Sequence, residues 1–300
     1  MNIIISKFLE IRKKLYCYFF ADRIIASYPN VKAKDNRVNL YDYHPELFNH
    51  NRYNDSRWNL GDSLGFVVVS FMLEKRGLSL DTCVKKRKHL NCIGSNVFAS
   101  FQHATIWGGG VHYFKNYSFL YRFPFSRFDF RAVRGPLSRK VILNYGHKCP
   151  EVYGDPAILM PLIFNPQCNK THELLVIPQF ISEVEFRKKH PDLYVISMNT
   201  NDYKSVITAI KSSKKVITSS LHGIILADAY GVPSVLYRSL GRNADFKYLD
   251  YYYSTGRQNI NIASSYEEAL TMEPLPLPNL SVLQEGLLNT FPYDLWDDRV

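Results

Sequence analysis

The sequence predicts an α/β protein in which two parallel β-sheets are each covered by helices. Short apolar segments of strand length alternate with segments of helical length, a pattern typical of parallel sheets with helices on both faces. The alternation occurs on both sides of a polar, proline-containing stretch at 162–173. Three hundred residues also exceed what a single core usually organises, so we expect two domains.

The first half is expected to contain two helices and three short strands. A helix is predicted at 62–77, which is long, apolar and closed by a glycine, and another at 136–146. Pro136 suits the first turn of this second helix, and Gly146 suits its end. Three apolar stretches are predicted to be strands: 91–97, 103–110 and 131–135.

The second half shows the alternation more clearly. Helices are predicted at 202–213, after an Asp or Asn cap, and at 223–231. Four apolar stretches are predicted to be buried strands: 173–179, 193–199, 214–220 and 232–238. The stretch 273–280 is too rich in proline for regular structure, and we expect it to wrap back over the surface.

The domain organisation follows from these elements. We expect a basic N-terminal helix at 1–35, an N-terminal domain at 36–168 and a C-terminal domain with a proline-rich tail at 169–300. Charged residues interrupt the apolar residues of 1–25, so neither a signal peptide nor a membrane span is predicted there. This helix is expected either to pack on the fold or to lie on an anionic membrane surface.

The formal net charge of +10 favours anionic partners such as phosphorylated small molecules or an acidic membrane surface, although a basic surface without a special partner is the alternative. The basic runs at 85–88 and 187–189 fit no nucleic-acid-binding pattern, so no nucleic acid partner is expected. The five cysteines lack C-x-x-C spacing, and no cluster has metal-ligand spacing. We therefore predict no metal and a reducing, cytoplasmic location.

The segment "SSLHG" at 219–223 is the first candidate site. Ligands of open parallel sheets bind beyond the carboxyl ends of strands, and His222 lies directly after a predicted strand, where a helix begins. The first N–H groups of that helix favour an anion, Ser219 and Ser220 can donate hydroxyls, and Gly223 would let a ligand approach the backbone. His222 could then protonate a bound substrate. The alternative is a histidine that only caps the helix or bonds a neighbour.

Six motifs cover most of residues 59–256. They are NLGDSL (59–64), IWGGGV (106–111), AVRGPLS (132–138), YGDPAILMP (153–161), VITSSLHGIILADAYGVPSV (216–235) and DFKYLDYYYSTG (245–256). Their types and order resemble the polysaccharide pyruvyltransferase family, in particular its bacterial exopolysaccharide and capsule members.

This resemblance implies a glycosyltransferase-B-like fold, with two Rossmann-like domains that face a cleft. The N-terminal domain would hold the acceptor and the C-terminal domain the donor. It also implies that phosphoenolpyruvate is the co-substrate, with no other cofactor, and that its pyruvyl unit becomes a cyclic ketal across two sugar hydroxyls as phosphate leaves. The acceptor would be a saccharide of a surface polysaccharide, such as capsule or lipopolysaccharide, or its lipid-linked precursor at the inner membrane face. The protein would then be cytoplasmic, with peripheral contact to the anionic membrane.

The resemblance also assigns roles to residues of this sequence. His222 would be the general acid that protonates the methylene carbon of the donor, and Asp62 would bind or deprotonate an acceptor hydroxyl. The expected donor-binding residues are Arg134, Ser219, Ser220, Leu221, Gly223, Arg238 and Lys247. The expected acceptor-binding residues are Asn59, Gly61, Trp107 and Tyr251.

Several of these residues have a structural alternative. Asp62 could simply cap its helix, and Arg134 could form a structural ion pair. The turn at 154–156 is expected to close the first domain, and the tyrosines at 251–253 could belong to the core. Some family members carry an arginine where this chain has Ser220, which leaves the donor-binding cation unassigned.

Two other functions compete with pyruvyl transfer. A glycosyltransferase with a nucleotide-sugar donor would share the fold, but the second domain lacks a clear Glu-x6-Glu pattern for ribose and base binding. A non-catalytic scaffold of a polysaccharide assembly complex is the third interpretation.

Overall fold

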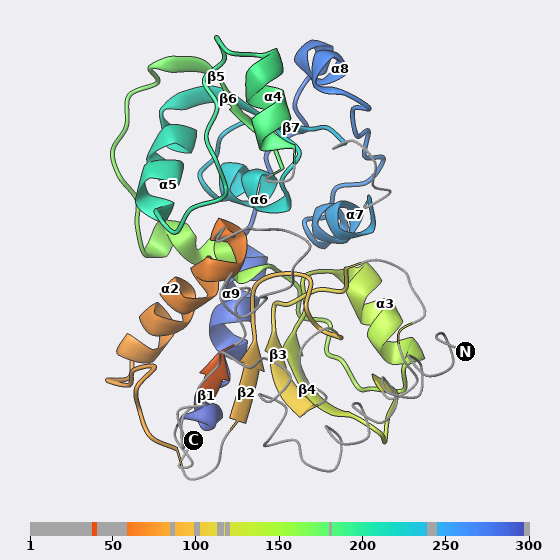
Figure 1. Ribbon diagram of the computed structural model, residues 1–300. Coiled ribbons are helices and arrows are strands. Elements are labelled where there is room, and N and C mark those ends of the chain that lie inside the picture. The colour runs from red at the N-terminus through yellow and green to blue at the C-terminus, as the bar shows by residue number, and fades with distance from the viewer. Residues whose placement is uncertain are drawn as a thin grey trace, which may run out of the picture.

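The computed structural model of the chain contains two parallel β-sheets, one above the other in the view of Figure 1. The structure describes residues 38–40, 59–84, 88–98, 103–112, 117, 121–179, 182–238 and 245–296. The α/β class predicted from the alternation of strands and helices is confirmed in these residues. The expected basic helix at 1–35 lies outside them.

The first sheet has the order β1-β2-β3-β4, and all its neighbouring strands are parallel. Its strands are β1 (Val38–Leu40), β2 (Lys88–Asn91), β3 (His103–Trp107) and β4 (Arg127–Ala132). The helices of this half are α2 (Leu60–Glu74) and α3 (Pro136–Asn144). The chain leaves α2 through Gly77, whose φ of 65° is readily adopted only by glycine.

The second sheet has the order β5-β6-β7 and is also parallel. Its strands are β5 (His172–Ile177), β6 (Ser213–Thr218) and β7 (Ser234–Leu236). The accompanying helices are α4 (Glu183–Lys189), α5 (Tyr203–Lys211), α6 (Leu221–Ala229), α7 (Asp245–Ser254) and α8 (Tyr266–Thr271). Asp202 caps α5 as predicted, because its side chain accepts a hydrogen bond from Ser205 N.

A short 3₁₀ helix, η4 (Pro156–Leu162), joins the two halves. It contacts both α2 and α6, and Figure 1 shows the upper end of α2 below α6, with the rest of the helix running down beside the first sheet. One buried hydrophobic cluster runs through this junction and includes Leu64 from α2, Ile158 from η4 and Ile225 from α6. Helix α6 is apolar on nearly all sides, as expected for a helix buried at such a junction.

The end of the chain returns to the first sheet. Residues 273–280 have no regular structure, as predicted, and lead into α9 (Ser281–Thr290) and η5 (Tyr293–Leu295). The indole of Trp107 donates to the Leu287 carbonyl at 3.0 Å, and the Tyr293 hydroxyl donates to the Met72 carbonyl at 2.9 Å. Helix α9 therefore packs against the first sheet, although the sequence groups it with the second domain.

Three predicted strands differ from the structure. Strand β2 ends at Asn91 instead of continuing through 91–97, because Gly94 has a φ of 106° and turns the chain. Strand β4 begins earlier and overlaps only the first two residues of the predicted 131–135, because it ends at Ala132 and Gly135 already caps α3. The stretch 193–199 forms only a single bridge, Val195 to Val176, because most of it is half-exposed and irregular.

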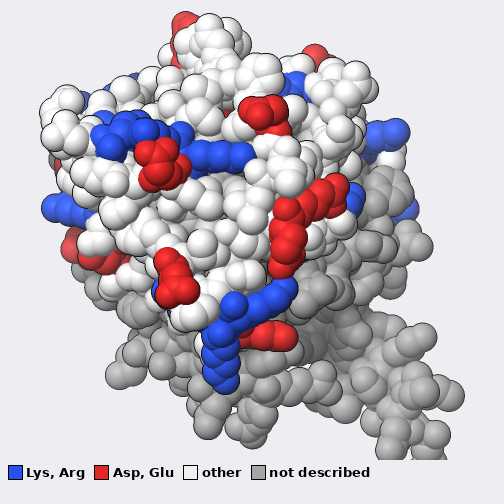
Figure 2. Space-filling view, turned by 90° about the horizontal axis from the view of Figure 1, so that it is seen from above, with Lys and Arg blue, Asp and Glu red and all other residues white. Residues whose placement is uncertain are grey.

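Surface charge is mixed on the face seen from above in Figure 2. Lysine and arginine side chains of the described residues lie among acidic side chains there, and they form no continuous basic patch on that face. Among the described helices, none combines the length and the apolar character needed to cross a membrane.

Candidate active site

The turn between β6 and α6 places His222 in the first turn of a helix. Thr218, the last residue of β6, fixes this turn, because its hydroxyl donates to the Ile177 carbonyl at 2.7 Å and accepts from Ser220 N at 2.9 Å. A Cβ on Gly223 would lie 2.4 Å from Thr218 Oγ1. The close packing against Thr218 explains why residue 223 is a glycine, whereas the sequence suggested that this glycine lets a ligand approach.

His222 is nearly enclosed by two other segments of the chain. The residue is 7% exposed. Its ring lies against Gly61 of α2 so closely that a Cβ there would be 1.7 Å from Nδ1. Its Nε2 lies 3.7 Å from Oδ2 of Asp155, whose side chain is fully buried. The two residues form an ion pair when the ring is protonated.

The two carboxylate oxygens of Asp155 have different surroundings. Oδ1 caps η4 by accepting a hydrogen bond from Ala157 N at 3.1 Å. Oδ2 and His222 Nε2 are both buried and have no hydrogen-bond partner among the described residues. Such orphaned buried polar atoms are rare, and they mark a place where a ligand atom, a water molecule or a proton completes the structure.

The sequence did not identify Asp155 as part of the site. The turn at 154–156 was expected to close the first domain, and Asp155 does begin η4. Its contact with a residue 67 positions later depends on the packing of η4 against α6. The only sequence signal was the YGDPAILMP motif, which contributed to the family resemblance.

Asn59, Gly61 and Asp62 lie where α2 begins, beside His222. Asn59 is the N-cap and donates from Nδ2 to Asp62 Oδ2 at 2.8 Å, while Leu60 N donates to the Met198 carbonyl at 2.9 Å. Asp62 lies inside the first turn, so it is not the helix cap that the sequence offered as an alternative. Of these residues, Gly61 touches the His222 ring, whereas the Asp62 carboxylate faces Asn59 and lies close to Gly94, where a Cβ would be 2.5 Å from Asp62 Oδ1.

Helix starts from both halves of the chain meet at this site. Gly61 in the first turn of α2 touches the ring of His222, which lies in the first turn of α6. The first N–H groups of an α-helix lack intrahelical acceptors and carry partial positive charge. Helix starts of this kind favour a nearby anion, although Leu60 N at the start of α2 is already bound by the Met198 carbonyl.

The remaining residues of the turn have different surroundings. Ser219 Oγ accepts from Gln179 N at 2.8 Å, and the Ser219 carbonyl accepts from the Tyr248 hydroxyl at 2.8 Å, so Ser219 holds the strand ends together. Leu221 is a buried core residue. Ser220 is the N-cap of α6 and is half-buried, and its side chain makes no capping hydrogen bond.

Arg134 has the geometry of the structural ion pair that the sequence left open. Its guanidinium is fully buried and donates to Asp250 Oδ2 at 3.0 Å, Ser95 Oγ at 2.7 Å and the Val111 carbonyl at 2.7 Å. Asp250 also accepts from the backbone and the hydroxyl of Ser138. All three guanidinium nitrogens are therefore bound within the protein, and this arginine ties a loop of the first half to α7.

The other two predicted cations lie near α7. Arg238 binds Asp245 at 2.7 Å, and its hydrogen bonds with that carboxylate raise the pKa of the guanidinium. The Lys247 ammonium lies 4.9 Å from the centre of the Tyr248 ring. No contact in the described structure joins either residue to His222, so a role in donor binding stays a prediction for both.

Trp107 and Tyr251, expected to bind the acceptor, belong to the core. Both side chains are fully buried. The Trp107 ring packs edge-on against Phe291, and the Tyr251 hydroxyl donates to Asp228 at 2.9 Å. Burial raises the pKa of Tyr251 well above its usual range. These side chains have no surface to offer a sugar, which supports the core interpretation that the sequence left open for the tyrosines.

The described residues contain no group of three or more His, Cys, Asp or Glu side chains that could hold a metal ion. The fold and the site together define an α/β protein with a buried histidine–carboxylate pair at the place where the first turns of α2 and α6 touch.

Comparison with known proteins then identifies the family. The model of the family described as polysaccharide pyruvyl transferase matches residues 11–239, most of the chain. The chain belongs to this family, as the six motifs predicted, and the family indicates a transferase with a role in pyruvyl transfer.

Individual relatives are distant. The uncharacterised protein L143 of Acanthamoeba polyphaga mimivirus is 22% identical over 206 residues, which are 64% of this chain and 69% of that protein. A solved structure of a functionally uncharacterised protein from Klebsiella pneumoniae is 14% identical, with a TM-score of 0.45. That match covers 80% of this chain and 93% of the Klebsiella chain.

Proposed function

We propose that the protein transfers the pyruvyl group of phosphoenolpyruvate to a sugar of a surface polysaccharide or of its lipid-linked precursor, with His222 as the general acid. One observation carries this proposal. His222 Nε2 and Asp155 Oδ2 are buried 3.7 Å apart and have no other described partner, in a chain of this family. In this arrangement His222 Nε2, which faces the Asp155 carboxylate, is the nitrogen from which a proton would be delivered to the donor.

The reaction can be written so that atoms and charges balance. His222 delivers a proton to the methylene carbon of the donor, which becomes a methyl group, and the adjacent carbon becomes cationic. One sugar hydroxyl adds to that carbon, a second hydroxyl replaces the phosphate, and the product is a cyclic ketal. One hydroxyl proton restores the protonated ring of His222, and the other leaves with the phosphate. Asp62, which accepts a hydrogen bond from Asn59, would accept a hydroxyl proton in transit.

Donor binding is assigned here mainly to the backbone. The carboxylate and phosphate of the donor are anions, and the N–H groups at the starts of α2 and α6 favour negative charge. Ser220 Oγ, which makes no capping bond to α6, would add a hydroxyl donor. In this arrangement the two sheets form the two sides of a glycosyltransferase-B-like fold, with the donor between them.

The experiment that tests the proposal is a ligand-binding measurement followed by turnover. Thermal unfolding is recorded with phosphoenolpyruvate, UDP or CMP, because a ligand at ten to one hundred times its Kd adds roughly 1.4 to 2.7 kcal/mol of stability. We expect phosphoenolpyruvate to raise the unfolding temperature and UDP and CMP to leave it unchanged. Phosphate release and the mass of the product are then measured against a panel of saccharide acceptors.

The variant His222→Ala should abolish phosphate release but keep the phosphoenolpyruvate shift. A shift with UDP or CMP, and none with phosphoenolpyruvate, would instead indicate a nucleotide-sugar glycosyltransferase. Full turnover by folded His222→Ala protein would eliminate His222 as the acid.

A further inference from the structure

An exposed apolar surface lies at the end of the first sheet that is remote from the second sheet. It is formed by the turn before β4 and by the last turn of α3, a helix that Figure 1 shows running away from α7. Phe123 is 60% exposed, Phe125 is 45% exposed and Leu143 is 41% exposed. Together with the exposed Pro124, these residues form what we term the apolar tip. Several large apolar side chains at one exposed place are typical of a surface that binds a partner.

The backbone of the apolar tip is held against the end of α3. Phe123 N donates to the Tyr145 carbonyl at 3.0 Å, and the Arg122 guanidinium donates to the Asn144 carbonyl at 3.1 Å. A Cβ on Gly146 would lie 3.6 Å from Phe123 Cβ, so the turn and the helix end are in van der Waals contact. These contacts fix the backbone that carries the exposed phenylalanine side chain.

The surroundings of the apolar tip are strongly basic. Residues 121–148 contain seven lysines and arginines and a single acidic residue, Asp129, which Arg131 binds at 2.7 Å. Four exposed cations of this stretch form no ion pair within the described part of the chain, and we term them the basic rim: Arg122, Arg127, Lys140 and Lys148. Their positive charge is therefore left for an anionic partner.

The basic rim surrounds the apolar tip on both segments. Arg122 and Arg127 flank the turn that carries the two phenylalanines. Lys140 precedes Leu143 by three residues on α3, a spacing that puts both side chains on the same face of a helix. Lys148 follows the end of that helix. Positive charge and apolar surface therefore occur together at this end of the molecule.

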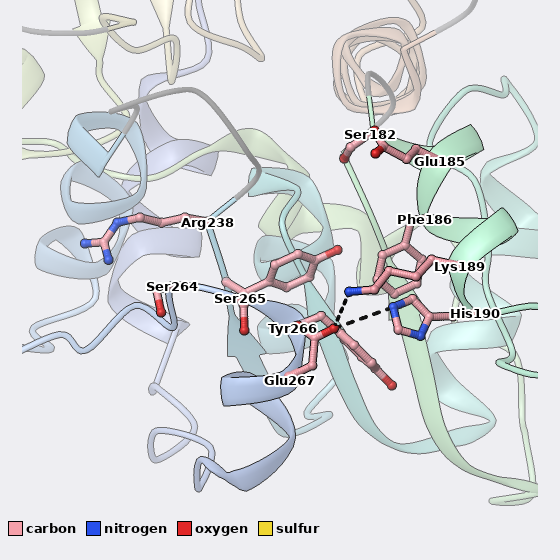
Figure 3. A pocket seen from close by; sticks show the side chains of 11 residues that line it. Ser182, Glu185, Phe186, Lys189, His190, Arg238, Ser264, Ser265, Tyr266 and Glu267 are labelled. Carbon is pink, nitrogen blue, oxygen red and sulfur yellow. Dashed lines mark hydrogen bonds and ion pairs between the residues drawn. The ribbon is translucent and has the colours of Figure 1, made fainter.

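Several exposed cations of the second half are neutralised by neighbouring carboxylates. Figure 3 shows Lys189 against Glu267, whose carboxylate lies 2.6 Å from the ammonium, and Arg238 binds Asp245 at 2.7 Å. Such pairs weaken the attraction of that surface for an anion. The unpaired cations around the apolar tip are thus a local feature and do not simply follow from the net charge of the chain.

We propose that the apolar tip and the basic rim bind an anionic membrane surface, with the two phenylalanines entering the boundary between headgroups and acyl chains. Such a surface supplies negative charge for the rim and an apolar layer for the tip, whereas a soluble anion supplies only the charge. A stable protein interface needs about 800 Å² from each partner, far more than four partly exposed side chains provide. The inference concerns a surface remote from His222 and does not rest on the proposed function.

The test measures binding of the full chain to vesicles of phosphatidylcholine, with and without phosphatidylglycerol as the anionic lipid, by flotation. We expect binding to the anionic vesicles, and we expect it to weaken as the salt concentration rises. Phe123→Ser removes apolar contact and should weaken binding about tenfold. Lys140→Glu should weaken it about fivefold or more, because one basic residue near an anionic surface contributes about that factor.

Matched controls come from α4 on the second half of the chain. Val184 and Lys188 are both exposed there, so Val184→Ser and Lys188→Glu repeat the same kinds of change away from the apolar tip. Both controls should bind the anionic vesicles like the wild type. His222→Ala should do so too, so failure of pyruvyl transfer and failure of membrane binding are separate results.

Insertion is measured separately with tryptophan fluorescence. Phe123→Trp should be quenched by phosphatidylcholine brominated in its acyl chains, in vesicles that also contain phosphatidylglycerol, whereas Val184→Trp should show only the wild-type level of quenching. The inference is overturned if the wild type does not bind anionic vesicles or binds neutral vesicles equally well. It is also overturned if either Phe123→Ser or Lys140→Glu binds as tightly as the wild type, or if Phe123→Trp escapes quenching. A dimer in solution that Phe123→Ser dissociates would make a second copy the occupant and would overturn it as well.

Discussion

Replacement of Gly61 by alanine tests whether α2 shapes the position of His222. The new methyl group would lie 1.7 Å from Nδ1, 2.3 Å from Cε1 and 2.4 Å from Cγ of His222. Ordinary contact begins at 3.4 Å, so the ring must move by about 1.7 Å. Because Cγ is also too close, the whole ring must be displaced, by a new rotamer or by a shift of α6.

This clash should lower the free energy of unfolding or leave it unchanged, because two opposing effects are combined. Overpacking a buried site costs about 1–3 kcal/mol, whereas glycine to alanine inside a helix gains about 1 kcal/mol. The net effect of Gly61→Ala is therefore a loss of about 0–2 kcal/mol. In a His222→Ala background the three nearest atoms are gone, and only the gain of about 1 kcal/mol remains. The coupling between the two substitutions should be about 1–3 kcal/mol.

Urea unfolding of the wild type, both single variants and the double variant measures this coupling directly. Gly65→Ala is the matched control on the same helix, since its methyl group would meet Cys92 Sγ at 2.8 Å and not His222. Its effect should be the same with and without His222. An effect of Gly61→Ala that is equally independent of His222 would refute the packing described here. A ring displaced by this distance should also lose about 10²-fold or more in turnover.

Other predictions concern the carboxylate partner, a buried histidine and two thiols. Asp155→Asn keeps an oxygen for the hydrogen bond from Ala157 N, so the unfolding midpoint should hardly change. Because the carboxylate is lost, phosphate release should fall about 10²-fold or more. Unaltered turnover would contradict the role of Asp155. Burial lowers the pKa of His147, so the unfolded state binds more protons and stability should fall as the pH drops through the ordinary histidine value of 6.5. Urea unfolding at pH 7.5 and 5.5 should show this loss in the wild type and a smaller one in His147→Gln. Burial raises the pKa of Cys149 to about 12, so alkylation followed by peptide mapping should label exposed Cys83 and spare Cys149 until the chain unfolds.

Local features of the sequence predicted the three strands of the second sheet, although they also predicted a strand at 193–199 that the structure lacks, and they predicted the position of His222. Strand β6 ends in the β-branched run Val216–Thr218, and α6 begins three residues later at Leu221, so both the strand end and the helix start are visible in the sequence. In the first half, strand β2 was displaced because a single glycine turn at Gly94 decides where it ends. Apolar periodicity does not report such a turn.

Contacts between distant segments could not be predicted in the same way. The family resemblance assigned Trp107 to acceptor binding, but its indole is buried and its partner Leu287 lies 180 positions later in the chain. Arg134 looked like a donor-binding cation, but Asp250 on α7 holds it. Both assignments depend on how the two halves pack, which residue spacing alone does not specify.

His222 and Asp155 lie where η4, α2 and α6 meet in a hydrophobic cluster shared by both sheets. Two buried polar atoms without partners cost free energy, and they persist only where the surrounding structure leaves them no alternative. Here the hydrophobic cluster that includes η4, α2 and α6 holds Asp155, Gly61 and His222 on three separate segments. Relaxation of the pair would require α6 or η4 to leave a core that both sheets share. The same core that stabilises the fold therefore keeps the histidine and the carboxylate in place.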